Sequence, residues 1–300
     1  MQDPFQFYGE QEFVQSYRFR KETVIDVLIP LVLSRIGSAS RKGLPIPAHL
    51  QLLIALRFYA TGSFQSVALA ENVKLFIRFP NTLRDQQENI SKLFAIASFP
   101  SVSACVDCTH ILIKNPGGTI GEIFRNRKRQ FSLNVQVACD PNMKIVDIDV
   151  RYPGSTHDSV IFDRSALRIR FETNQIPGLL LGDNGYACRK YLLTPIIGPS
   201  PGPEVHYNRN HIKTRNIIER VFGALKRRFP CLRRGLATKL ETSVAIICAT
   251  SVLYNISKQR QGEDFGDVQN EEYHEDNIII EADNNGLAFR RAFISINFHE

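Results

Sequence analysis

The chain has 300 residues, a hydrophobic share of 43% and no long low-complexity tract. This composition is typical of a soluble globular protein with one large domain, or with one domain and a smaller companion. No run approaches eighteen uncharged apolar residues and no basic segment precedes an apolar block at the start, so we expect neither a membrane span nor a secretory signal. Six cysteines lack the density of a disulfide framework and favour a reducing compartment.

Charge is distributed unevenly along the chain. Residues 261–300 hold ten acidic residues against Arg290 and Arg291, a net charge of −8. Because the whole chain carries +7, the first 260 residues carry +15. A folded body that basic favours a polyanionic partner, most simply nucleic acid, although solubility alone would also explain the charge.

The N-terminal region, residues 1–100, is predicted to be mostly helical. Apolar residues recur at helical spacing over 13–33 and 49–59, and the connector over 37–47 is rich in Gly, Ser and Pro. The second helix is expected to end before Gly62, because Thr-Gly-Ser follows it.

From residue 103 the pattern changes to short apolar runs. Strands are predicted over 105–113, 131–139, 144–150 and 179–181. The turn Asp140-Pro141-Asn142 predicts a hairpin between the second and third runs. The fourth run is wholly apolar and ends at Gly182-Asp183, as a buried central strand would.

Helices are predicted over 159–171, 214–229 and 243–256. The second is the strongest, because Thr214 can cap it and apolar residues recur every three or four positions along one face. The order three strands, helix, strand, helix predicts an α/β fold that begins with an antiparallel meander, extended by parallel strands and flanked by helices. The RNase H-like fold has this order, as do several other folds.

We therefore predict three regions along the chain. Residues 1–100 would be the helical N-terminal region, and residues 101–260 an RNase H-like nuclease domain. Residues 261–300 would be an acidic, mobile tail, because most of this stretch lacks basic residues.

Four acidic residues stand where a carboxylate is locally costly or well placed for chemistry. Asp107 lies within an apolar strand, and a carboxylate there needs compensating partners. Asp183 ends the predicted central strand, where α/β sheets tend to place ligands, although a plain turn residue is an alternative. Glu219 lies one position from the buried stripe of its helix, but could be merely solvated. Asp158 precedes a helix and could be its N-cap.

Such acids suit the chemistry of phosphodiesters. Hydrolysis or strand transfer needs an activated nucleophile and compensation of charge on the phosphate, and two divalent ions roughly 4 Å apart supply both. Mg²⁺ and Mn²⁺ take oxygen ligands from carboxylates on separate elements that meet at one sheet edge. We predict Asp107, Asp183 and Glu219 as the catalytic carboxylates, and the same three with Asp158 as metal ligands.

Other chemistries are less well supported. The Cys105-x-x-Cys108 pair suggests zinc or redox chemistry, but no second pair stands at a zinc-ribbon distance. A Ser/His/Asp hydrolase is disfavoured, because no Gly-x-Ser-x-Gly elbow appears. His110 and His157 flank two of the carboxylates, and could orient water or phosphate or be structural.

Several ordered motifs carry a family resemblance. They are Val-Asp-Cys-Thr-His-Ile (106–111), Arg-Tyr-Pro-Gly-Ser-Thr-His-Asp-Ser (151–159), Leu-Leu-Gly-Asp-Asn-Gly-Tyr (180–186) and Thr-Arg-Asn-Ile-Ile-Glu-Arg-Val-Phe-Gly-Ala-Leu-Lys-Arg-Arg-Phe (214–229). Together they resemble blocks of the PIF/Harbinger transposases of the DDE superfamily, and of the nucleases derived from these by domestication. The resemblance implies a DDE nuclease with Asp107, Asp183 and Glu219 as its triad, and Asp158 as a further metal ligand.

The sequence also departs from this family pattern. After Gln65 the family continues through a helix-turn-helix, whereas this chain passes from Glu71-Asn72-Val73 directly into Lys74 and the segment beyond. The resemblance therefore implies a shortened N-terminal region without the recognition helix.

Basic clusters flank the carboxylates in sequence. They comprise Arg125, Arg127, Lys128, Arg129, Lys226, Arg227 and Arg228. Each cluster could be a solvated face or could contact phosphate. The same runs could act as nuclear-import signals, so we expect a nuclear location, with the cytoplasm as a second one.

The sequence thus predicts a Mg²⁺- or Mn²⁺-dependent endonuclease or strand transferase acting on DNA. An RNase would use the same chemistry. The alternative is a catalytically inactive domesticated transposase that binds DNA or protein, working with a separate Myb-like DNA-binding partner. The shortened N-terminal region favours the alternative, and the intact acidic set argues against it. Either form is compatible with an oligomer.

Overall fold

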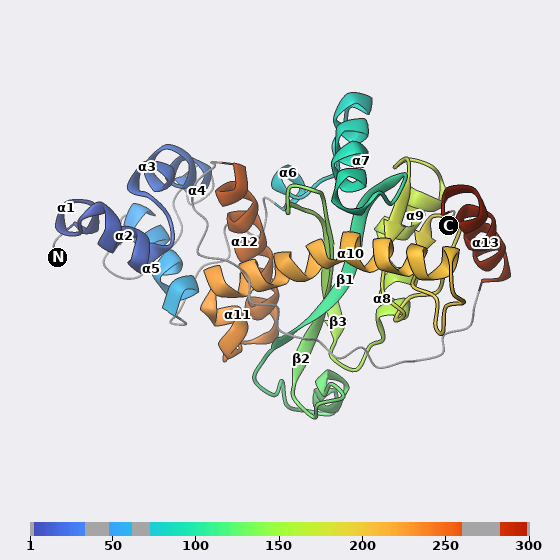
Figure 1. The fold of residues 1–300 in the computed structure, drawn as a ribbon. Helices are drawn as coiled ribbons and strands as arrows, with labels where there is room; N and C mark the ends of the chain where they lie inside the picture. The colour runs from blue at the N-terminus through green and yellow to red at the C-terminus, as the bar shows by residue number, and fades with distance from the viewer. Residues whose placement is uncertain (1–2, 34–47, 62–72, 260–282, 299–300) are drawn as a thin grey trace. The chain divides into compact units, whose positions relative to one another are not determined.

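The structure, a computed structural model, describes residues 3–33, 48–61, 73–259 and 283–298. Figure 1 shows the fold and labels most of its helices and strands. The contacts divide the chain into two compact units. Unit 1 comprises Met1–Phe76, Ile111–Gly121 and Ala224–Asp267, and unit 2 comprises Ile77–His110, Glu122–Gly223 and Val268–Glu300. The predicted boundaries at residues 100 and 260 stay a prediction.

Apart from the last residues of one strand, the described elements of unit 1 are helical. They are α1 (Pro4–Phe7), α2 (Glu10–Tyr17), α3 (Lys21–Thr23), the π-helical turn η1 (Val24–Leu28), α4 (Ile29–Leu33), α5 (Ala48–Thr61), α6 (Val73–Phe76), α11 (Pro230–Arg234) and α12 (Leu240–Gln259). Helices α2, α4 and α11 contact α5. The buried Tyr59 ring of α5 meets Phe229 edge to face at 6.4 Å. Burial of such apolar side chains stabilises these short helices, which would be marginal alone.

The two helices predicted over 13–33 and 49–59 are confirmed, with one break. Helix α2 ends at Tyr17, because its C-cap Arg18 has a φ of 65° in the left-handed region, and the chain becomes helical again at Lys21. The connector over 37–47 and the segment around Gly62, including the shortened N-terminal stretch, lie outside the described residues.

Helix α12 is the one helix of the described residues that is long and apolar enough to cross a membrane. In the structure 72% of its most apolar window is buried within the protein. Asn255 of α12 also donates a hydrogen bond to the Phe76 carbonyl at the end of α6. Such extensive burial is typical of a helix in the core of a protein.

Unit 2 contains a mixed five-stranded sheet. Its strands are β1 (Val102–Leu112), β2 (Ser132–Cys139), β3 (Ile145–Pro153), β4 (Leu179–Leu181) and β5 (Leu192–Leu193). Their spatial order is β3-β2-β1-β4-β5. Strands β2 and β3 pair antiparallel, as the hairpin prediction requires, and β4 pairs parallel with both β1 and β5. The predicted α/β class is confirmed, whereas the short β5 was not predicted.

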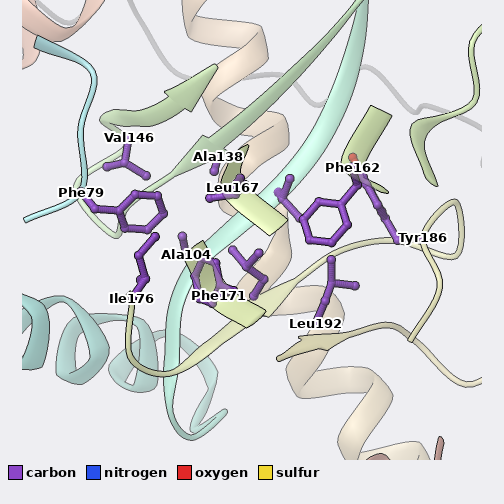
Figure 2. Packing of buried hydrophobic residues seen from close by; sticks show 12 residues of the cluster. Phe79, Ala104, Ala138, Val146, Phe162, Leu167, Phe171, Ile176, Tyr186 and Leu192 are labelled. Carbon is purple, nitrogen blue, oxygen red and sulfur yellow. The ribbon is translucent and has the colours of Figure 1, made fainter. Parts of the chain in front are cut away.

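The helices of unit 2 cover both faces of this sheet. They are α7 (Leu83–Ala97), the 3-10 turn η3 (Gly121–Phe124), α8 (Asp158–Asp163), α9 (Ala166–Glu172), α10 (Pro203–Arg228) and α13 (Asn284–Asn297). Successive side chains of a strand point to opposite faces. Ala104 therefore packs with Phe162 of α8 and Phe171 of α9 (Figure 2), whereas Cys105 faces α10, where its thiol donates to the Thr214 carbonyl.

Two helix predictions need correction. The helix predicted over 159–171 is divided into α8 and α9, because Ser165 stops the first and caps the second by accepting a hydrogen bond from the Arg168 amide. The strongest predicted helix begins at Pro203 rather than Thr214. Thr214 is not a cap: it is fully buried within α10, and its hydroxyl donates to the Asn210 carbonyl.

The predicted mobile tail is wrong for its described part. Residues 284–297 form α13, in which Phe293 stacks on Phe99 with ring centroids 5.6 Å apart. The Arg290 guanidinium donates to the carbonyls of Thr194 and Pro195. These contacts lie far away in the sequence, so composition alone could not reveal them. Residues 260–282 lie outside the described part of the chain.

Candidate metal centre

Two of the predicted carboxylates are brought level by the pairing of parallel strands. Strand β1 pairs with β4 so that Cys105 is opposite Leu181. Asp107 and Asp183 each follow these partners by two residues. Asp183 lies just beyond the carboxyl end of the short β4, and Asp107 lies beside it within the longer β1, so the two carboxylates meet where β4 ends. Asp183 also accepts a hydrogen bond from the Gly185 amide at 2.9 Å, which makes it a turn residue as well.

Asp158 reaches the same place from α8, which lies on the face of the sheet opposite to α10. It is the first residue of α8, and His157 occupies the cap position without a side-chain hydrogen bond to the helix. The N-cap interpretation of Asp158 is therefore wrong. Asn134 of β2 instead donates to the Asp158 Oδ1 atom at 2.7 Å and to the Thr156 carbonyl at 2.9 Å. These two bonds fix the loop that delivers the Asp158 carboxylate.

Close backbone approaches shape the same loops. A side chain at Gly154 would collide with the Ser132 hydroxyl and with the Phe124 carbonyl, so the loop before Asp158 requires glycine there. A Cβ atom at Gly185 would lie 2.9 Å from Asp183 Oδ1 and 3.5 Å from Asp158 Oδ2. The absence of this atom leaves space beside the two carboxylates.

Asp107, Asp158 and Asp183 form one cluster. One oxygen atom of each carboxylate lies within 4.8 Å of the corresponding atoms of the other two. Oxygen ligands in an octahedral shell with bonds near 2.1 Å are roughly 3 to 4.2 Å apart, so small adjustments would let the three hold one Mg²⁺ or Mn²⁺. The donor set, the space beside Gly185 and the dense negative charge all fit a hard divalent cation.

Glu219 is not part of this cluster. It lies one helical turn beyond Arg215 on α10, and Arg215 joins it to the site. One guanidinium nitrogen of Arg215 lies 3.2 Å from Asp107 Oδ2, and another lies 3.1 Å from Glu219 Oε1. The Arg215 side chain is only 6% exposed, against 14% for Asp107 and 31% for Glu219. A buried arginine thus bridges two of the predicted triad.

The protonation of the three aspartates reflects their crowding. Burial raises the pKa of Asp107 well above its usual range, the Asp183 carboxylate raises it further, and Arg215 opposes both effects. Burial is also the largest cause of the raised pKa values of Asp158 and Asp183. Carboxylates that resist ionisation in this way are stabilised by a nearby cation.

The two cysteines flanking Asp107 belong to different surroundings. Cys105 faces α10, whereas the Cys108 Sγ atom lies 3.3 Å from the Tyr186 hydroxyl. Side chains three positions apart in a strand point to opposite faces, so Cys105 and Cys108 cannot coordinate one zinc ion together. Burial raises the pKa of Cys108 well above its usual range, which keeps it a thiol beside the carboxylates.

Comparison with protein families matches residues 106–255 to the DDE superfamily endonuclease model. This match spans all four predicted acids and half of the chain. The chain belongs to the DDE endonuclease superfamily.

Individual relatives of this DDE superfamily member include proteins named as nucleases. This chain is 31% identical over 273 residues to the mouse protein named "Putative nuclease HARBI1". The alignment covers 83% of this chain and 78% of the mouse protein. The human protein of that name is 30% identical over the same shares. Antagonist of Like Heterochromatin Protein 1 from Arabidopsis thaliana is 23% identical, over 63% of this chain and 52% of that protein. No solved structure matches significantly.

In this DDE superfamily member, the basic residues considered as phosphate contacts differ in their surroundings. Arg127, Lys128 and Arg129 are exposed, and an Arg127 guanidinium nitrogen lies 2.7 Å from His157 Nδ1, next to Asp158. Arg125 is held by Glu122 and stacks over Phe131.

Of the second basic cluster, Lys226 and Arg227 are half-buried. Arg228 is buried in unit 1, where it lies over the Phe19 ring and donates to the Arg18 carbonyl. These contacts make Arg228 a structural residue.

Two residues of the site were missed in the sequence. Arg215 precedes Glu219 by four positions, a spacing that places the two side chains together on a helix and could have revealed the pair. Asn134 is a polar residue within an otherwise buried strand, the same signal that singled out Asp107. His110 is accounted for by a 3.0 Å contact with the Ser132 hydroxyl.

Proposed function

We propose that this protein is a divalent-metal-dependent nuclease that hydrolyses or transfers DNA strands, with Mg²⁺ or Mn²⁺ held by Asp107, Asp158 and Asp183. The convergence of three carboxylate oxygens within 4.8 Å carries this proposal. Membership of the DDE endonuclease superfamily supports a phosphodiester substrate.

The fold supports an RNase H-like domain as the carrier of this activity. The sheet order β3-β2-β1-β4-β5, with β2 and β3 antiparallel and β4 parallel to β1, agrees with that architecture. Asp107 within β1 and Asp183 just after β4 then lie side by side, and α10 presents Glu219 from one face. We propose Glu219 as a further ligand, after it leaves Arg215.

The chain's own residues prepare this site for a cation. When bound, the ion lowers the pKa of an attacking water or 3′-hydroxyl and offsets charge on the phosphate. Asn134 holds Asp158 by its Oδ1 atom and leaves Oδ2 directed toward Gly185 and Asp183. Arg127 and His157, beside Asp158, are placed to contact a phosphate of the substrate.

The wider setting is also part of the proposal. The net charge of +15 over the first 260 residues favours DNA as the substrate and the nucleus as the location. Because the sequence pattern lacks the family's recognition helix, we propose that a separate Myb-like DNA-binding protein, or an oligomer, selects the target.

Plasmid nicking tests the activity directly. We expect the full chain to nick supercoiled DNA with Mg²⁺ or Mn²⁺ and not with EDTA, and Asp107→Asn or Asp183→Asn to reduce the rate at least about a thousandfold, since each removes a metal ligand. Asp163→Asn on α8 is the matched control, because Asp163 pairs with Arg189 instead of joining the cluster. Equal nicking by wild type and both cluster variants would contradict the proposal.

A catalytically inactive binding protein is the second candidate. The position of Glu219, outside the cluster, and a plant relative whose name describes antagonism of a heterochromatin protein both favour it. Calorimetric titration with Mn²⁺ separates the candidates. A nuclease binds Mn²⁺ at the cluster and loses this binding in Asp183→Asn, whereas a remnant shows no such site.

A further inference from the structure

The buried Arg215 guanidinium occupies an unusual electrostatic position beside the candidate metal centre. It bonds to Asp107, a member of the carboxylate cluster, and to Glu219, which lies outside the cluster. Each contact uses a different terminal nitrogen, so the planar fork spans the two carboxylates. The side chain is 6% exposed, and little water is available to screen its charge.

We infer that Arg215 is an internal counter-cation that competes with the metal for Asp107 and Glu219, and so sets how tightly the centre binds divalent ions. This inference rests on the proposed function and adds a determinant of metal affinity. Arg215 is a positioning residue here, because it acts through the carboxylates.

The first reason is electrostatic. Without an ion, crowded carboxylates repel one another, and a fixed positive charge offsets this repulsion. The direction of the pKa effects agrees: Arg215 opposes the rise at both Asp107 and Asp183. When a divalent ion arrives, the same guanidinium repels it. Arg215 therefore favours the metal-free centre and opposes the metal-bound one.

The second reason is geometric. Glu219 Oε1 is engaged by Arg215 at 3.1 Å, and no Glu219 oxygen belongs to the group that lies within 4.8 Å. For Glu219 to join the ligand set, it must exchange its arginine partner for the ion. At 31% exposure the Glu219 side chain is accessible enough to move. The contribution of Glu219 to metal binding is consequently hidden in wild type and appears when Arg215 is neutralised.

Calorimetric titration of the full chain with Mn²⁺ alone tests this inference. Arg215→Gln removes the charge that repels the ion, and is therefore expected to bind Mn²⁺ about tenfold more tightly than wild type. Glu219→Gln alone should change the affinity less than threefold. The double variant Arg215→Gln, Glu219→Gln should lose a measurable part of the gain.

Two further variants keep the result interpretable. Arg220→Gln removes one charge from an exposed position of the same helix and should leave the affinity within twofold of wild type. Arg215→Lys keeps the charge but not the fork, and should bind Mn²⁺ more tightly than wild type but less tightly than Arg215→Gln. Its gain over wild type can be measured even if the glutamine variant fails to fold. Circular dichroism confirms the fold of each variant.

The outcomes separate this inference from the proposed function. Should Asp183→Asn abolish Mn²⁺ binding while folded Arg215→Gln binds no more tightly than wild type, the counter-cation role is overturned and the metal centre stands. Should wild type bind no Mn²⁺ that depends on Asp183, the proposed function itself fails.

Discussion

At each aspartate of the cluster, burial opposes the ionisation of the carboxyl group. Asp107, Asp158 and Asp183 are each partly withdrawn from water, and burial is the largest cause of their raised pKa values. Burial disfavours an ionised carboxylate unless a positive partner compensates for it. Arg215 partly compensates Asp107 and Asp183, and Arg127 partly compensates Asp158, but burial still raises all three pKa values.

This conflict sets the direction of two pH effects. The three carboxyls hold their protons more tightly in the folded chain than in the unfolded chain. From about pH 4, where unfolded aspartates ionise, the metal-free protein therefore loses stability as the pH rises through the raised pKa values. A divalent ion that binds as proposed would restore this stability, because it requires the ionised carboxylates.

Metal binding should accordingly be sensitive to acid. We expect Mn²⁺ affinity to fall between pH 7.5 and pH 5, by about tenfold per pH unit for each proton displaced, since the carboxyls must lose protons to bind. Titrations in buffers of different ionisation enthalpy measure the protons released. Affinity that stays constant down to pH 5, with no proton release, would contradict the raised pKa values.

At the scale of secondary-structure elements, tertiary contacts lengthen helices beyond the limits that their local sequence predicts. Helix α10 begins at Pro203 because its first turns bury Tyr207 and His211 against Phe99. This extension makes Thr214 an interior residue. Helix α13 adds Phe293 and Phe298 to the same aromatic group. Aromatic packing at such centroid distances contributes stability beyond the area buried.

The docking of α13 depends on a small residue. Alanine ordinarily stabilises a helix relative to glycine by about 1 kcal/mol, but a Cβ atom at Gly286 would overlap the Cys188 carbonyl. We therefore expect Gly286→Ala to destabilise the protein by about 1–3 kcal/mol, as overpacking does. Denaturant unfolding measures the change, and Asn285→Ala at an exposed neighbouring position is the control. Equal or greater stability of Gly286→Ala would show that α13 is not docked as described.

At the scale of the whole molecule, the uneven charge predicts how DNA binding responds to salt. Lys128 and Arg129 are exposed in unit 2, which also contains the cluster. If both contact phosphates, their joint replacement by alanine should reduce the slope of log affinity against log salt by about 2.

The control for this charge change is a pair in the same unit. Arg84→Ala with Lys92→Ala removes two positive charges from exposed positions on α7. Fluorescence anisotropy with duplex DNA at several salt concentrations compares the variants. The same slope for wild type and the Lys128, Arg129 variant would remove this segment from the DNA-binding surface.

The sequence by itself determined the sheet and the most important acids. Short apolar runs bounded by turn residues predicted four of the five strands, because strands buried on both faces are apolar along most of their length. Asp107 stood out as a costly carboxylate within a strand, and Asp183 as the residue at the end of another. Asp107 and Asp183 lie close together because β1 and β4 pair in parallel, and such pairing can be anticipated from the sequence.

Only the tertiary structure decided which acids share a site. Asp158 joins the cluster because Asn134, on a different strand, holds its loop, and the local sequence is equally compatible with a helix cap. Glu219 lies outside the cluster because the buried Arg215 takes one of its oxygens. Both outcomes depend on distances between elements separated in the chain, and such distances are set by packing of the whole domain rather than by local residue preferences.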